Sequence, residues 1–242
     1  METLTTSSIL TKAIAPVGDS LNCSPLRRGA LLIALALALV WLAFSPTARA
    51  VSPPPDGGYF NHNTAEGEDA LFSLTTGKFN TAIGNNALFS NTTGGQNTAN
   101  GALALSGNIS GTANTASGAF ALGNNTAGYE NTASGAFALN ANTTGKFDTA
   151  TGHSALSHNT TGLFNTANGD NALYSNTTAN SNTANRYRAL FSNTTGFGNT
   201  ANGDNALSSN TTGKSNTANG YTAFYFNTTG SYNTANGSNA LY

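Results

Sequence analysis

A fixed spacing of 17 residues governs most of this chain. The triplet Asn-Thr-Ala begins at Asn63 and recurs every 17 residues up to Asn233, and Asp148 is the one aspartate among the eleven starting residues. The eleven copies follow one another without an insertion, and the last is ten residues long. Their consensus is N-T-A-x-G-x-x-A-L-x-x-N-T-T-G-x-x, whose positions are numbered 1 to 17 below, with coil 1 beginning at Asn63. Such regular self-similarity is typical of a stack of equivalent units.

The length of the repeat favours a β-solenoid. Seventeen residues are too few for the helical hairpins of about 33 to 47 residues that build other repeat arrays. Gly at position 5 and N-T-T-G at positions 12 to 15 mark the places where the backbone needs turns or left-handed geometry, and they leave short strands around positions 1 to 4 and 8 to 11. The sequence therefore predicts an all-β, parallel β-solenoid of eleven coils over residues 63–242, with coils about 4.8 Å apart.

Strand alternation predicts which side chains form the core. Position 4 varies from Glu66 to Ile83 to Thr151, so it faces solvent, which directs position 2 outward and Ala at position 3 inward. Alternation lets only one of Ala at position 8 and Leu at position 9 face inward. We expect Leu, because burying one leucine contributes roughly 1.5 to 3 kcal/mol; the alternative is an outer stripe of large residues that requires a partner. The expected core of the central coils is Ala133, Ala138, Leu139, Ala150, Leu156, Ala167 and Leu173.

Two rows of asparagine are expected to run along the solenoid axis. In-register stacking places the position 1 and position 12 amides of successive coils above one another, where they can form amide ladders. The central members of these ladders are Asn131, Asn142, Asn165 and Asn176. Threonine rows at positions 2, 13 and 14 suit strands because threonine is β-branched.

One coil departs from the consensus. Coil 8 has Arg186 at position 5 and Arg188 at position 7, whereas coils 7 and 9 have Asp170 and Asp204 at position 6. Stacking at about 4.8 Å predicts a ladder of ion pairs between these four side chains. Because Arg186 stands where the other coils have glycine, its turn is expected to differ from those of its neighbours.

The N-terminal residues resemble a secretory signal. Arg27 and Arg28 precede an apolar run over 29–44, and Ala48-Arg49-Ala50 supplies a small-x-small cleavage site. This run of 16 residues is shorter than the ~20 needed to cross a bilayer. We therefore expect a signal peptide over 1–50, a linker or N-terminal cap over 51–62, no transmembrane segment in the mature chain, and a secreted or cell-surface protein.

Composition and residue distribution argue against several functional classes. Charged residues are only 8% of the chain and the net charge is -1, so a nucleic-acid partner is not expected. The single cysteine, Cys23, lies in the leader, which removes disulfides and thiolate sites from the mature chain. A metal pair at His153 and His158, calcium at the Glu66-Glu68-Asp69 cluster and a catalytic carboxylate pair at Asp170 and Asp204 are less favoured than solvated surface residues. We expect no enzymatic activity, no metal and no cofactor.

The repeat resembles that of a known family. The N-T-A-x-G-x-x-A-L element, which recurs from Asn63 to Tyr242, is similar to the S-x-A-x-G-x-x-A motif in the YadA-like heads of trimeric autotransporter adhesins, and to repeats of bacterial surface and tail-fibre-like proteins. The resemblance implies a β-roll that assembles as a homotrimer and binds a host or matrix surface. The repeats of those heads are shorter than the 17 residues found in this chain.

Three functional hypotheses follow. The first is an exported, adhesin-like structural or binding rod with a surface or matrix ligand. The second is an ice-binding or ordered-surface-binding protein, if the Thr and Asn ladders lie on one flat face without bulky neighbours. The third is a carbohydrate-binding solenoid, which needs an aromatic groove. The aromatic residues relevant to the third, which we expect to scatter over variable positions, are Phe72, Phe89, Tyr174, Phe191, Tyr225 and Tyr242.

Overall fold

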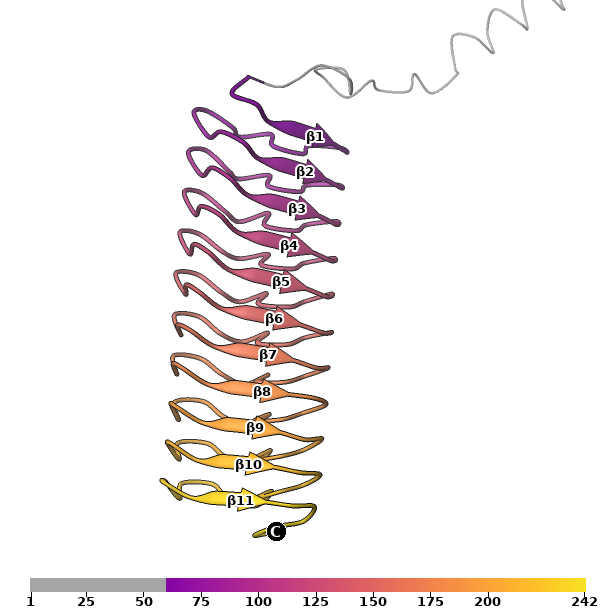
Figure 1. Ribbon diagram of the computed structural model, residues 1–242. Coiled ribbons are helices and arrows are strands. Elements are labelled where there is room, and N and C mark those ends of the chain that lie inside the picture. The colour runs from indigo at the N-terminus through magenta and orange to yellow at the C-terminus, as the bar shows by residue number, and fades with distance from the viewer. Residues whose placement is uncertain (1–59) are drawn as a thin grey trace, which may run out of the picture. The chain divides into compact units, whose positions relative to one another are not determined.

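The computed structural model describes residues 60–242, so the expected signal peptide and residues 51–59 of the expected linker lie outside the described part. Eleven short parallel strands follow one another in a single sheet whose order is the order of the sequence (Figure 1). Each strand consists of positions 2 to 4 of one repeat. The strands are β1 (Thr64–Glu66), β2 (Thr81–Ile83), β3 (Thr98–Asn100), β4 (Thr115–Ser117), β5 (Thr132–Ser134), β6 (Thr149–Thr151), β7 (Thr166–Asn168), β8 (Thr183–Asn185), β9 (Thr200–Asn202), β10 (Thr217–Asn219) and β11 (Thr234–Asn236).

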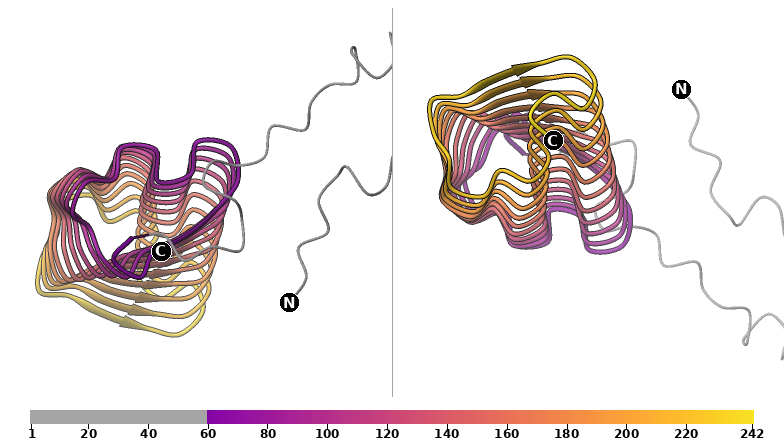
Figure 2. Two further views of the ribbon diagram at one scale, coloured as in Figure 1. Left: turned by 90° about the horizontal axis from the view of Figure 1, so that it is seen from above. Right: turned by 90° about the horizontal axis from the view of Figure 1, so that it is seen from below.

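Every strand pairs with the next in strict register. Thr132 faces Thr149 and Ala133 faces Ala150, one repeat later. Hydrogen bonds between coils also continue outside the sheet: the Leu139 amide donates to the Ala155 carbonyl at 3.0 Å, and the Gly152 amide donates to the Ser134 carbonyl at 2.8 Å. The backbone is thus paired around much of each coil, and the coils lie above one another along one axis (Figure 2). These features confirm the parallel β-solenoid with one coil per repeat.

The interior is a narrow core of alanine and leucine. Along each strand the outer positions 2 and 4 point outward and Ala at position 3 points inward, as in β5, where only the central residue is buried. Ala at position 8 and Leu at position 9 complete the core. The seven residues expected in the central core all have 0% exposure: Ala133, Ala138, Leu139, Ala150, Leu156, Ala167 and Leu173.

The second expected strand is wrong, and the reason lies in backbone conformation. Positions 8 to 11 belong to a turn over positions 6 to 11, in which Phe137 at position 7 and Leu139 at position 9 adopt φ values of 60° and 51°. Alternation applies only to extended backbone, so Ala138 and Leu139 both face inward. The left-handed conformation costs an L-residue roughly 1 to 2 kcal/mol. Burying the leucine contributes roughly 1.5 to 3 kcal/mol, which offsets that cost.

The two glycines that recur in the repeat have different physical roles. At position 5 the glycines have φ between 118° and 153°, as expected, and a Cβ on Gly135 would meet the Gly152 carbonyl oxygen. At positions 12 to 15 the chain bends, as expected, but the glycines at position 15 do not adopt the left-handed alternative, because they are absent from the positive-φ residues. A Cβ on Gly94 would instead meet the Asn91 side-chain oxygen and the Gly111 carbonyl. Glycine therefore eases the close approach of the side-chain amides there, although Ala179 takes this position in coil 7 and accepts the same two amide bonds at 2.9 and 3.1 Å.

Coil 8 differs at its turn, as predicted. Arg186 has φ of 90°, compared with 145° at Gly169 and 153° at Gly203. A side chain replaces the hydrogen of glycine at this position, so the backbone rotates toward a region that an L-residue tolerates better. The neighbouring inter-coil hydrogen bond from the Gly203 amide to the Asn185 carbonyl is 3.2 Å long, whereas the corresponding Gly152 bond is 2.8 Å.

The described residues before coil 1 already follow the solenoid backbone. The Asn61 carbonyl accepts a hydrogen bond from the Phe79 amide at 3.1 Å, and the His62 ring stacks on Phe79 with centroids 5.2 Å apart. Residues 61–62 therefore occupy positions 16 and 17 of a preceding partial coil. Within 60–242 there is no helix with the length and apolar character required to cross a membrane.

Candidate functional site

The position 1 asparagines form a buried ladder of amides. Asn131 Nδ2 donates to Asn114 Oδ1 at 3.1 Å and to the Gly145 carbonyl at 2.9 Å. Its Oδ1 accepts the backbone N–H of Asp148 at 3.0 Å. Asn165 belongs to the same row and has 0% exposure. Each amide thus links its own coil to its neighbours.

A second ladder runs through position 12. Asn142 Nδ2 donates to Asn125 Oδ1 at 2.8 Å, and Asn176 Nδ2 donates to Asn159 Oδ1 at 2.8 Å. In coil 1 the partly buried Leu74 takes this position, so the row begins with Asn91. Both ladders are enclosed, and among the described residues no buried side-chain nitrogen or oxygen lacks a hydrogen-bond partner. The ladders therefore hold the fold together and are not surfaces for a ligand.

Asp148 replaces asparagine in the position 1 ladder, where it is fully buried. Its Oδ1 accepts the backbone N–H of Asn165 at 2.8 Å and Asn165 Nδ2 at 3.1 Å, while Oδ2 accepts Asn159 Nδ2 at 3.1 Å. An ionised carboxylate has no hydrogen to donate, so it cannot make the two donor bonds that Asn131 makes at the same position. Burial raises the pKa of Asp148 to about 7, although the hydrogen bonds from Asn165 and Asn159 act in the opposite direction.

The outer face of the sheet carries two rows of small polar side chains. Threonine occupies position 2 of every strand, and position 4 is mostly Asn, Ser or Thr. Near the C-terminal end the position 4 amides form an exposed ladder, in which Asn202 Nδ2 donates to Asn219 Oδ1 at 2.8 Å and Asn219 Nδ2 to Asn236 Oδ1 at 2.8 Å. The position 13 threonines lie in the turn outside the sheet, where the Thr143 hydroxyl donates to the Thr160 carbonyl at 2.9 Å. The threonine rows therefore do not share one face.

The six aromatic residues expected to scatter share one position of the repeat, although the other aromatic residues of the array occupy positions 6, 7, 9, 11, 16 and 17. The six singled out above all occupy position 10, and those in adjacent coils stack. Ring centroids are 5.3 Å apart for Phe72 and Phe89 and 5.2 Å apart for Tyr174 and Phe191. Parallel rings in successive coils are expected when identical positions superpose at about 4.8 Å.

The expected ion-pair ladder is not formed. Within residues 60–242 the one carboxylate within 4.0 Å of a Lys, Arg or His side-chain nitrogen is Asp170, whose Oδ1 lies 3.4 Å from His153 Nδ1. The guanidinium carbon of Arg188 lies instead 4.2 Å from the centroid of the Phe191 ring. An exposed ion pair contributes only about 0 to 1 kcal/mol, so stacking on an adjacent aromatic face competes with it.

The described residues offer little for catalysis or metal binding. Over 60–242 no three His, Cys, Asp or Glu side chains gather as they would around a metal ion. His153 contacts Asp170, while His158 Nδ1 lies 3.1 Å from the Tyr174 carbonyl oxygen. The two histidines are therefore engaged with different neighbours.

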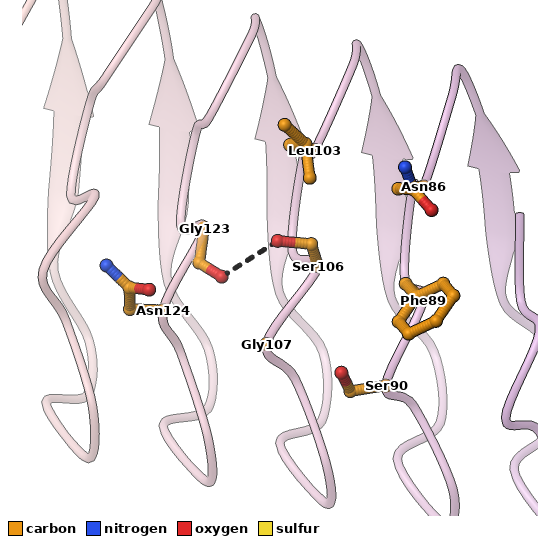
Figure 3. Close-up of a pocket in the computed structure, with 8 residues that line it drawn as sticks. All are labelled: Asn86, Phe89, Ser90, Leu103, Ser106, Gly107, Gly123 and Asn124. Carbon is orange, nitrogen blue, oxygen red and sulfur yellow. Dashed lines mark hydrogen bonds between the residues drawn. The ribbon is translucent and has the colours of Figure 1, made fainter. Parts of the chain in front are cut away.

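One surface depression, with a volume of about 340 Å³, spans coils 2 to 4 (Figure 3). Several of its lining residues are small, and Figure 3 shows Phe89 toward one end of the group. The residues around it are Asn86, Phe89, Ser90, Leu103, Ser106, Gly107, Gly123 and Asn124. No charged side chain contributes to this lining.

Comparison with known proteins gives no relative for this chain: no family model, curated protein or solved structure matches it. The fold and the geometry of its surfaces therefore carry the functional argument.

Proposed function

We propose that this protein is exported and acts as a rigid, adhesin-like rod at the cell surface or outside the cell. The observation that carries the proposal is that the repeat has two kinds of position, one uniform and buried, the other variable and at the surface. Positions 1, 3, 8, 9, 12 and 15, which are nearly uniform in sequence, are buried, while positions 6, 7, 10, 11, 16 and 17 vary and are almost all half-buried or exposed. A uniform scaffold thus presents a different side-chain pattern in each coil, as a binding rod requires.

Two further features support the proposal. Ten complete coils at about 4.8 Å make a rod of roughly 48 Å, long enough to present several contact points to a partner. Large apolar side chains are exposed on it, including Phe79 and Phe164 at 57% each, which is a common property of interaction surfaces. The similarity of the repeat to YadA-like heads adds a homotrimer to the proposal, and light scattering on the purified full chain tests that assembly directly.

Export and adhesion are tested together. Expressed in a bacterium, the full chain should lose residues 1–50 and appear outside the cytoplasm with Val51 as its first residue, as determined by N-terminal sequencing. The recovered protein should bind saturably to wells coated with collagen, fibronectin or laminin.

A variant with an altered surface serves as the matched control. Replacing Phe120, Phe137, Phe147 and Phe164 by serine removes exposed rings without touching the core, so binding should fall while the melting temperature stays close to that of the wild type. An uncleaved protein that remains in the cytoplasm, or binding that is indifferent to the surface change, would contradict the proposal.

Ice or ordered-surface binding is a second candidate on a narrower ground than the shared face of ladders expected from the sequence: the Asn ladders of positions 1 and 12 are buried, and the threonine row at position 2 alone lies on the sheet. If it is correct, the protein should produce thermal hysteresis in a nanolitre osmometer. Thr166→Tyr, in the middle of the row, should abolish the effect by interrupting the regular face, whereas Thr161→Tyr at position 14, outside the sheet, should leave it unchanged. Absence of thermal hysteresis in the wild type would remove this candidate.

A further inference from the structure

The depression on coils 2 to 4 exists because the aromatic row at position 10 is interrupted there. Phe72 and Phe89 occupy this position in coils 1 and 2, and Ser106 and Gly123 occupy it in coils 3 and 4. Figure 3 shows these small residues, with Gly107, along the part of the surface next to the Phe89 ring. The missing rings leave the hollow.

Phe89 lacks a second stacking partner, unlike the comparable ring further along the rod. Phe72 stacks on Phe89 from coil 1, and the next ring of a parallel stack would come from coil 3, where Ser106 stands. Phe191 is also followed by a serine, Ser208, but it contacts both Tyr174 and the guanidinium of Arg188. Phe191 therefore has a cationic contact in addition to its ring partner, whereas within residues 60–242 Phe89, beside the depression, has Phe72 as its one aromatic or cationic contact.

The polar groups around the depression are neutral and available. The Ser106 hydroxyl donates to the Gly123 carbonyl at 3.2 Å, and Asn86 Nδ2 donates to Asn85 Oδ1 at 2.8 Å, which leaves Asn86 Oδ1 as an acceptor. Within residues 60–242 the Ser90 hydroxyl and the Asn124 side-chain amide make no hydrogen bond to protein. A ligand for this surface should be uncharged, have a flat apolar face and carry several hydroxyl groups.

We propose that the depression binds one pyranose ring of a neutral, β-linked glucan. The axial C–H groups on the flat face of such a sugar carry partial positive charge and pack against the negative face of an aromatic ring, here Phe89. The sugar hydroxyls both donate and accept, which matches the Ser90 hydroxyl and the amides of Asn86 and Asn124. The volume of about 340 Å³ lies at the lower end of the roughly 300 to 1,000 Å³ of small-molecule sites, so it suits a single ring. This assignment does not depend on export or adhesion.

Titration of the full chain with cellotetraose, followed by isothermal calorimetry and by saturation-transfer NMR, tests the site. We expect weak, saturable binding, because the depression is open and contributes one aromatic face. Phe89→Ala should weaken binding about tenfold by removing the platform. Ser106→Phe should abolish binding, because the new ring continues the stack and occupies the sugar's place.

Matched variants and a second probe make each outcome decisive. Phe191→Ala, at the same position of coil 8, should retain the binding of the wild type, and circular dichroism should show the solenoid spectrum for all three variants. Absence of cellotetraose binding, or binding that survives both Phe89→Ala and Ser106→Phe, overturns the assignment. If N-acetyl-tyrosinamide binds as tightly as cellotetraose, and Phe89→Ala and Ser106→Phe weaken that binding in the same way, the assignment to a saccharide is overturned. The ligand would then be an aromatic side chain of a protein partner.

Discussion

Leu139→Asp should destabilise the solenoid by roughly 4 kcal/mol or more, measured as the free energy of unfolding in urea. Leu139 has 0% exposure in the central part of the core. Removing a buried leucine side chain typically costs 2 to 5 kcal/mol. The aspartate also introduces a carboxylate without a charged or hydrogen-bonding partner, which adds to that cost or forces the group to remain protonated. The melting temperature should fall accordingly.

Ser134→Asp provides the control in the same coil. Ser134 lies at position 4 of β5, where its side chain is exposed, and coil 1 already has Glu66 at that position. The free energy of unfolding should change by no more than about 0.5 kcal/mol. Equal destabilisation by both variants would contradict the inward orientation of position 9. A Leu139→Asp protein that keeps its stability but dissociates from an oligomer would point instead to leucine as an interface residue.

Much of the fold follows from the register of the repeat. A period of 17 residues without insertions lets coil pair with coil over the whole array, so parallel pairing and the inward position of Ala133 could be predicted from the sequence. The ladder residues Asn131 and Asn142 could be predicted for the same reason, since in-register stacking superposes identical amides.

The backbone of positions 7 to 9 could not be predicted by strand alternation. Three residue types as different as Phe137, Asn171 and Arg188 adopt positive φ at position 7, so the sequence pattern does not reveal the left-handed conformation. The one available signal is the frequency of Asn and Asp at this position, because both tolerate positive φ better than other residues. Strand alternation alone lets only one of Ala138 and Leu139 face inward, whereas the structure buries both.

The contacts of surface side chains were harder to predict than the core. The short distance between successive coils does not determine the direction in which a long side chain points. Arg188 is one coil away from two carboxylates in sequence register, yet its guanidinium lies on Phe191 within its own coil. The stacked aromatics show the opposite case. Phe72 and Phe89 occupy a position whose residue type changes from coil to coil, so the sequence shows no regular aromatic pattern. The superposition of coils nevertheless places the two rings in one row.

Asp148 should make the solenoid less stable as the pH rises from 4 to 8. The pKa of Asp148 is raised by burial from 3.8 to about 7 in the folded protein. Between these two values the folded state retains a proton that the unfolded state has released, so the free energy of unfolding falls by up to about 1.4 kcal/mol for each pH unit. Over the whole window the loss is on the order of 4 kcal/mol, and above pH 7 the stability contributed by this group stays at its low plateau.

Asp148→Asn should remove this pH dependence of the free energy of unfolding and should stabilise the protein most at pH 8. By the geometry of the repeat, the new Nδ2 donates to Asn131 Oδ1 and to the Gly162 carbonyl, because Asn131 makes the two equivalent bonds one coil earlier. Urea unfolding of both proteins at pH 5 and pH 8 isolates the contribution of this carboxyl, since all other titrating groups are common to them. Adding Asn131→Asp to the Asp148→Asn protein should restore the pH dependence one coil away. If Asp148→Asn instead retains the pH dependence of the wild type, the buried carboxyl does not hold its proton at neutral pH, and the dependence originates at another group.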